Sequence, residues 1–157
     1  MKLYLMRHGE AEGVYEGEGP ALSARGESEV NQIGEALSSK KIRLDHIYHS
    51  GKMRARQTAE IVESNLGADI PISKREGLKP NDPVPVFAKD LNDESGNILV
   101  VGHLPFVSKL TSYLLAETES ELMFSFGTAS VACLEYTHSV GWSMHWLIEP
   151  ENVAPNK

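Results

Sequence analysis

Two histidines and two arginines directly follow apolar runs of the sequence, where the side chains of a folded α/β protein gather into sites. Arg7 and His8 come after KLYLM, His103 comes after GNILVVG, and Arg54 lies just beyond LDHIYHS. Guanidinium groups bind phosphoryl oxygens through paired hydrogen bonds and keep their charge at neutral pH. A glycine stands beside each histidine, where it allows close backbone approach. The combination predicts a crevice for a dianionic group, and a phosphate fits it better than a carboxylate.

Strand-like and helix-like segments alternate along the chain. Short apolar runs predict strands, at 2–6, 44–50, 68–73 and 96–103. Apolar residues at helical spacing predict helices, at 26–40, 54–67, 82–93 and 104–117. Two runs rich in aromatic and β-branched residues predict a hairpin, at 130–137 and 142–149. We therefore expect a three-layer α/β sandwich, with a mostly parallel central sheet flanked by helices and the hairpin at one edge. In such sheets, ligands gather beyond the carboxyl ends of the strands.

Length and composition narrow the class of protein. The 157 residues fit one globular domain, predicted at 1–150 with a tail at 151–157, and Cys133 is expected to be a small buried hydrophobe. A net charge of −7 argues against nucleic-acid binding, so an anionic ligand needs a local cationic pocket. No apolar run has the length of a signal peptide core or of a membrane helix. We expect a cytoplasmic protein with neither a nucleic-acid nor a membrane partner.

Four motifs, in order along the chain, resemble the histidine phosphatase superfamily (phosphoglycerate mutase-like). They are the Arg-His-Gly triplet at 7–9, ALSARG at 21–26, SGKMRARQTAE at 50–60 and VVGHLPFV at 100–107. The size of the chain and the Leu-Pro pair after His103 look most like the SixA-type phosphohistidine phosphatases. Gly51 departs from this pattern, because the family usually has proline there, and the departure bears on the rigidity of this loop.

The resemblance implies a role for each matched residue. His8 is the nucleophile that forms a phosphohistidine, and Arg7, Arg54 and a protonated His103 hold the phosphoryl group. The substrate-binding residues are taken to be Arg7, Gly9, Arg54 and Leu104. Neither a metal nor another cofactor is expected, since the arginines neutralise the phosphoryl charge. The expected partner is a phosphorylated histidine-containing protein, such as a phosphotransfer domain.

Two further questions stay open at the level of sequence. The carboxylates that could serve as a general acid are Glu10, Glu12, Glu76 and Asp82, of which Glu76 is the best candidate. The alternatives in function are a phosphatase or mutase for small phosphate esters and a noncatalytic phosphoprotein-binding module. Arg56 is expected on the surface, and His49 is left open between the crevice and a structural role. The other histidines, at 46, 138 and 145, are expected to be structural or solvated.

Overall fold

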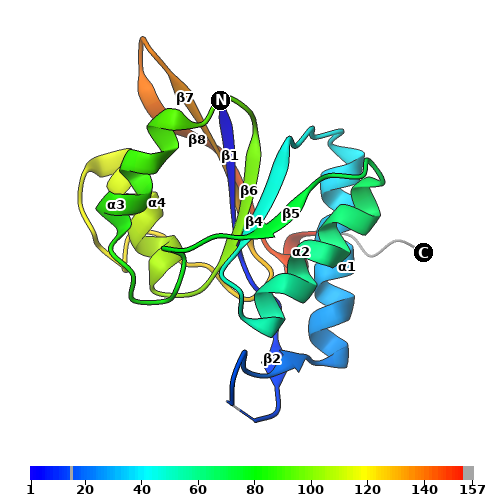
Figure 1. Ribbon diagram of the computed structural model, residues 1–157. Coiled ribbons are helices and arrows are strands. Elements are labelled where there is room, and N and C mark those ends of the chain that lie inside the picture. Colours follow the sequence, from blue (N-terminus) through cyan, green and yellow to red (C-terminus); the bar gives the residue numbers. More distant parts are fainter. Residues whose placement is uncertain (15, 154–157) are drawn as a thin grey trace.

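The computed structural model describes residues 1–14 and 16–153, and it places a six-stranded sheet between two pairs of helices (Figure 1). The strands of this sheet are β1 (Lys2–Arg7), β4 (His46–His49), β5 (Ile72–Lys74), β6 (Ile98–Gly102), β7 (Val131–Thr137) and β8 (Gly141–Ile148). The helices are α1 (Ala24–Ser39), α2 (Met53–Leu66), α3 (Val84–Asp90) and α4 (Phe106–Ala116). Short 3-10 helices follow at η1 (Leu91–Asp93) and η2 (Pro150–Asn152).

The strand order β5-β4-β6-β1-β7-β8 confirms the predicted fold class. The four strands β5, β4, β6 and β1 pair in parallel, whereas β7 pairs antiparallel with both β1 and β8. The last two strands form the hairpin predicted for one edge. The carboxyl ends of the parallel strands therefore all face the same end of the molecule.

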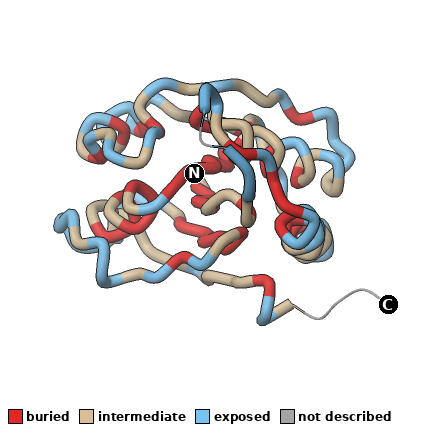
Figure 2. The backbone as a smooth tube through the Cα atoms, turned by 90° about the horizontal axis from the view of Figure 1, so that it is seen from below, coloured by how far each residue is buried: buried red, intermediate tan, exposed pale blue. Residues whose placement is uncertain are grey.

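Successive side chains of the central strands point to opposite faces of the sheet, which divides the hydrophobic core into two clusters. In β1, Tyr4 and Met6 point to the cluster beneath α1 and α2, whereas Leu3 and Leu5 point to the cluster beneath α3 and α4. Successive side chains of a strand face opposite sides of its sheet, so a strand covered on both faces is apolar throughout. Figure 2 shows the resulting buried backbone at the centre of the molecule, with exposed segments around it.

Helix signals in the sequence explain where two of the helices begin and end. Ser23 caps α1, because its hydroxyl accepts the N–H of Gly26 at 3.0 Å. The apolar stripe Val30, Ile33 and Leu37 is buried, as predicted. Helix α2 ends as predicted at Gly67, which has the positive φ of +63° that favours glycine.

Three features differ from the sequence-based expectations. A two-stranded ladder, β2 (Ala11–Glu12) with β3 (Ala21–Leu22), lies in the segment expected to be a loop. The helix predicted over 82–93 is α3 followed by η1. The predicted boundary after residue 150 falls inside η2, and Val153 packs against the core beneath α1 and α2, while 154–157 lie outside the described residues. In the described part of the chain, no helix has the length and apolar character needed to cross a membrane.

Candidate active site

The two histidines of the site are neighbours because their strands are neighbours. Arg7 at the end of β1 stands opposite Gly102 at the end of β6, so His8 and His103 leave the sheet side by side. The backbone N–H of His8 donates to the carbonyl of Gly102 at 3.0 Å, and the ring centroids of the two histidines are 5.0 Å apart. Ser50 follows β4, the strand on the other side of β6, and it reaches the ring of His103. The structure thus brings the three strand ends together.

The ring of His8 is held with one nitrogen free to react. Its Nδ1 lies 2.7 Å from the carbonyl oxygen of Gly9. Because a carbonyl only accepts, Nδ1 carries the proton and the lone pair is on Nε2. Burial is the main cause that lowers the pKa of His8 to about 4. The hydrogen bond to the Gly9 carbonyl opposes it as the second-largest effect, and the charges of Arg54 and then Arg7 lower the pKa by less. His8 is therefore a neutral imidazole at physiological pH, the form that acts as a nucleophile.

His103 is neutral as well in the free protein, whereas the protonated ring expected from the sequence concerns the site with a phosphoryl group bound and stays a prediction. His103 is 2% exposed, and its Nε2 lies 2.6 Å from the hydroxyl of Ser50, while its buried Nδ1 has no hydrogen-bond partner among the described residues. Burial, and to a lesser extent the charges of His8, Arg54, Lys52 and Arg7, together lower its pKa to about 3. The sequence pattern does not reveal this, because burial and surrounding cations act together only in the fold.

The positive charges of Arg7 and Arg54 act on both histidines. The guanidinium of Arg7 donates from one terminal nitrogen to the carbonyl of Phe126 at 2.9 Å, which fixes its direction. Its buried Nε has no hydrogen-bond partner in the described part of the chain, and burial lowers the pKa of the guanidinium. Arg54 lies on the first turn of α2 and depresses the pKa of both histidines, which shows that its charge acts on each ring. A Cβ on Gly19 would approach its terminal nitrogen within 2.7 Å, so the loop before β3 lies against this arginine.

Gly9 and Leu104, the other predicted substrate-binding residues, are placed differently. Gly9 is buried, and a Cβ at this position would lie 2.6 Å from a methyl of Val30, so glycine is needed for packing against α1. Its N–H donates to the hydroxyl of Thr58 at 3.0 Å. Leu104 directly follows His103 and is 36% exposed. The structure thus gives Gly9 a packing role, and a contact of either residue with substrate stays a prediction.

Comparison with known proteins assigns this arrangement to a family. Residues 3–82, which hold His8 and both arginines, match the model of the histidine phosphatase superfamily (branch 1). The chain belongs to this superfamily. It is 27% identical to the phosphohistidine phosphatase SixA of Escherichia coli strain K12, over the whole of this chain and 99% of SixA. The structure of the protein histidine phosphatase SixA complexed with tungstate is similar, with a TM-score of 0.85 and 26% identity over 97% of this chain and 99% of SixA.

A second relative matches only about half of this member of the superfamily. The 2,3-bisphosphoglycerate-dependent phosphoglycerate mutase of Parvibaculum lavamentivorans is 35% identical over 51% of this chain and 41% of the mutase. A match over about half of the chain does not separate the activities within the superfamily. The family and the full-length likeness to SixA support a phosphatase enzyme.

The candidate general acids have other contacts in this phosphatase. The side chain of Glu76 is 77% exposed and pairs with Lys74 at 3.4 Å. Glu10 accepts the hydroxyl proton of Ser23 at 2.9 Å, and Asp82 accepts the N–H of Lys79 at 2.8 Å. Among the described residues, the charged groups that shift the pKa values of the two catalytic histidines are cations only. In the same part of the chain no cluster of three His, Cys, Asp or Glu side chains could hold a metal ion.

His49 makes a structural hydrogen bond within its own loop. Its Nδ1 accepts the N–H of Gly51 at 3.0 Å. Gly51 has a φ of +94°, which proline cannot adopt, so the departure from the family pattern accompanies a turn closed by this hydrogen bond. The prediction that Arg56 lies on the surface is confirmed, because its guanidinium faces Glu18 and Glu60.

Sequence reasoning assigned no role to Ser50 or to Phe126. Ser50 is buried and hydrogen-bonded to His103, and it also accepts the N–H of Lys52 at 3.3 Å. Its place in the motif that contains Arg54 was the only available signal. Phe126 lies in a segment without periodicity, and the atom that contacts Arg7 is a backbone carbonyl, which carries no sequence signal.

Proposed function

We propose that this protein removes phosphate from a phosphorylated histidine of another protein, through a phosphohistidine formed on His8. The observation that carries the proposal is the neutral ring of His8, whose Nδ1–H is held by the Gly9 carbonyl so that the Nε2 lone pair is free, beside His103 and two arginines. SixA, with which the similarity extends over the full chain, is a phosphohistidine phosphatase by name.

The first step transfers the phosphoryl group. His8 Nε2 forms a bond to phosphorus as the phosphorus–nitrogen bond of the substrate histidine breaks, and the substrate imidazole leaves with the electron pair of that bond. Arg7 and Arg54 neutralise the charge on the phosphoryl oxygens, where the transition state is anionic. We infer that these cations make a metal or another cofactor unnecessary.

The second step returns His8 to its starting state. Water attacks phosphorus, the bond to His8 Nε2 breaks, and inorganic phosphate leaves. His103 is neutral in the free site. A bound dianion would offset the cations that depress its pKa, so in the complex the ring of His103 can take up a proton and donate it to a phosphoryl oxygen.

A phosphohistidine suits this site better than an alkyl phosphate ester. An alkyl ester expels an alkoxide unless an acid protonates it, and three of the four candidate carboxylates, Glu76, Glu10 and Asp82, have partners elsewhere in the described structure. A phosphohistidine with a protonated ring leaves as neutral imidazole, whose conjugate acid has a pKa of about 6.5. Transfer to His8 is then an exchange between like groups, which requires no strong general acid.

We infer further that a single catalytic domain performs this reaction on a phosphotransfer domain. The cytoplasmic location expected from the sequence stays a prediction. Tungstate, named in the SixA complex, should bind here in the place of the phosphoryl group and compete with substrate.

The test compares substrates on one enzyme preparation. A phosphotransfer domain phosphorylated on histidine, p-nitrophenyl phosphate and a set of sugar phosphates are assayed side by side, with chelator present in one arm. We expect the phosphoprotein to be the best substrate by kcat/KM, unaffected by chelator. Efficient hydrolysis of sugar phosphates instead would favour the small-ester phosphatase, and binding without turnover of any substrate would favour the noncatalytic module.

A further inference from the structure

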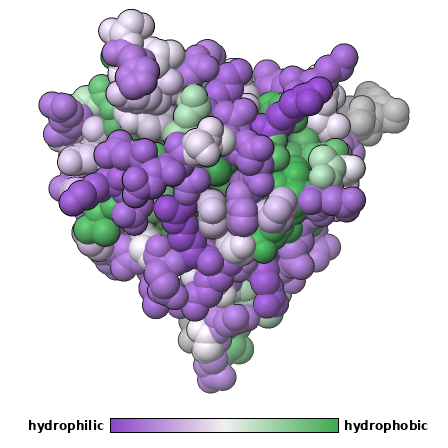
Figure 3. Space-filling model, turned by 45° about the horizontal axis from the view of Figure 1, so that its top comes forward, coloured by the Kyte–Doolittle hydropathy of each residue, from purple (hydrophilic) through white to green (hydrophobic). Residues whose placement is uncertain are grey.

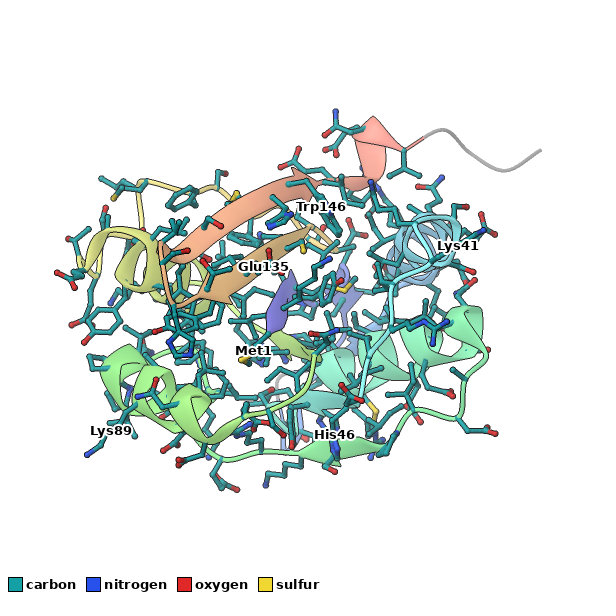
Figure 4. The ribbon with its side chains drawn as sticks, turned by 90° about the horizontal axis from the view of Figure 1, so that it is seen from above. Met1, Lys41, His46, Lys89, Glu135 and Trp146 are labelled. Carbon is teal, nitrogen blue, oxygen red and sulfur yellow. The ribbon has the colours of Figure 1, made fainter. Side chains whose placement is uncertain are left out.

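A second cationic cavity lies at the end of the sheet opposite the catalytic site. Its volume is about 490 Å³, and its wall includes Lys2, Lys40, Lys41 and Arg43 beside Tyr4 and Trp146. Lys2 begins β1 and His8 follows its end, so six residues at about 3.3 Å each separate the two sites by about 20 Å. Figure 4 looks onto this end, with Trp146 on β8 and Lys41 beyond α1, and Figure 3 shows mainly hydrophilic side chains on this face.

None of the four cations of this cavity has a carboxylate partner among the described residues. The cations that do form such pairs stand elsewhere, at Arg25, Arg56, Lys74, Arg75 and Lys109. The carboxylates nearest in the fold are already engaged. Glu135, which is opposite Lys2 in the sheet, bonds to His145 at 3.0 Å, and Asp45 accepts the N–H of Asn97 at 2.8 Å. No carboxylate is among the residues that line the cavity, so its wall is positively charged in a chain whose net charge is −7.

A structural role of the lysines does not account for the whole cluster. Lys40 and Lys41 follow the carboxyl end of α1, where positive charge offsets the helix dipole. The helix dipole does not explain the positions of Lys2 and Arg43, because Lys2 begins a central strand and Arg43 lies in the segment before β4. Segments far apart in the sequence thus bring like charges to one concavity, where they repel one another unless an anion is present.

The wall of the cavity is held by fixed contacts. Asn97 accepts the backbone N–H of Lys2 at 2.8 Å and donates to the carbonyl of Arg43 at 3.4 Å, which ties two of the cationic segments together. The ring of Trp146 lies 6.0 Å from that of Tyr4, and the ammonium of Lys40 stands 4.9 Å above the Trp146 ring. An aromatic wall beside several ammonium groups is suited to a ligand with more than one anionic group.

We propose that this cavity is a second, noncatalytic site, which binds a small polyanion carrying at least two phosphate groups. The volume is within the usual range for small-ligand sites. A nucleic acid or an extended acidic surface would need cations along a stripe, whereas here they converge on one hollow. Pyrophosphate and a nucleoside diphosphate share this chemistry. The proposal does not depend on the proposed function.

The experiment uses Trp146 as its own reporter. The chain has two tryptophans, so Trp142→Phe leaves Trp146 as the single source of tryptophan fluorescence. With His8→Ala added to prevent turnover, the full chain is titrated with pyrophosphate and, separately, with ADP. We expect saturable fluorescence changes with both. Equal affinities assign the binding energy to the phosphates, and tighter binding of ADP adds a contact of its base with Trp146.

Matched double variants show whether the cavity is responsible. Lys41→Gln/Arg43→Gln should weaken binding at least about tenfold, since each lost charge-assisted hydrogen bond is worth about a factor of ten or more. Lys79→Gln/Lys89→Gln changes the net charge by the same amount at exposed sites outside the cavity, and it should leave the affinity unchanged. Both double variants should turn over p-nitrophenyl phosphate normally when His8 is present.

Two results would overturn the proposal. One is the absence of a fluorescence response to either ligand at millimolar concentration, together with calorimetry of the His8→Ala protein that finds no second site. The other is equal weakening by the two double variants, because the effect would then come from net charge rather than from this cavity.

Discussion

His103 should make this protein lose stability in mild acid, and His103→Asn should remove that loss. In the fold, His103 is buried and its pKa is about 3, against an ordinary value of 6.5. Between these two values the unfolded chain binds a proton that the folded chain does not. Stability therefore falls as the pH falls below about 6.5, and the contribution is fully present only above that value.

The size of the effect follows from the two pKa values. A histidine with a pKa near 6.5 when unfolded, and one well below 5 when folded, costs about 2 kcal/mol of unfolding free energy between pH 7 and pH 5. The figure does not require the folded value to be exact, because any folded pKa below about 4 gives nearly the same loss at pH 5. His8 and the carboxylates titrate in both proteins, so the comparison with the variant isolates His103.

The assay is urea unfolding of the wild type and of His103→Asn, each at pH 7 and at pH 5. The wild type should lose about 2 kcal/mol more than the variant. Ser50→Ala is the matched control, since it removes the 2.6 Å hydrogen-bond partner but keeps the imidazole, and it should retain the acid loss. Equal losses in the wild type and in His103→Asn would refute the reasoning, because His103 would then titrate alike in both states.

The other predictions concern catalysis. His8→Ala should abolish turnover with the circular dichroism spectrum unchanged, and labelled phosphate trapped without acid should be found on His8; label on His103 would contradict the assignment. Arg54→Ala should cost about 3 kcal/mol or more in kcat/KM, whereas Arg56→Ala should cost far less, and a reversal would mean that the wrong arginine was assigned. Glu76→Gln should leave phosphohistidine turnover within about tenfold, measured by phosphate release, and a larger loss would make Glu76 the general acid.

The sheet and its site could be predicted wherever an apolar run stops at a polar group. Strand β1 shows why: its two faces are both covered, so its residues are apolar until Arg7, and the site begins there. Neither of the two apolar sequence segments indicates that β1 pairs with β6. It is this register, with Arg7 opposite Gly102, that makes His8 and His103 neighbours.

The sequence alone could not distinguish between two roles for Gly9. A glycine beside a catalytic histidine fits both close approach of a ligand and close packing of the backbone. The structure shows the packing, because α1 crosses near enough for Val30 to exclude a Cβ. The same holds for the loop that carries Phe126, since an irregular segment without period gives no sign of where its carbonyls point.

The cations of the site couple binding of the phosphoryl group to protonation of His103. The cations that would hold a dianion are also the charges that depress the pKa values of His8 and His103 beyond the effect of burial. In the free protein they keep His8 neutral and ready to attack. When a phosphoryl group binds, its two negative charges offset the two guanidinium groups, and the barrier to protonating His103 falls. A proton donor would then form only in the presence of the group that needs it, while a nucleophile is present throughout.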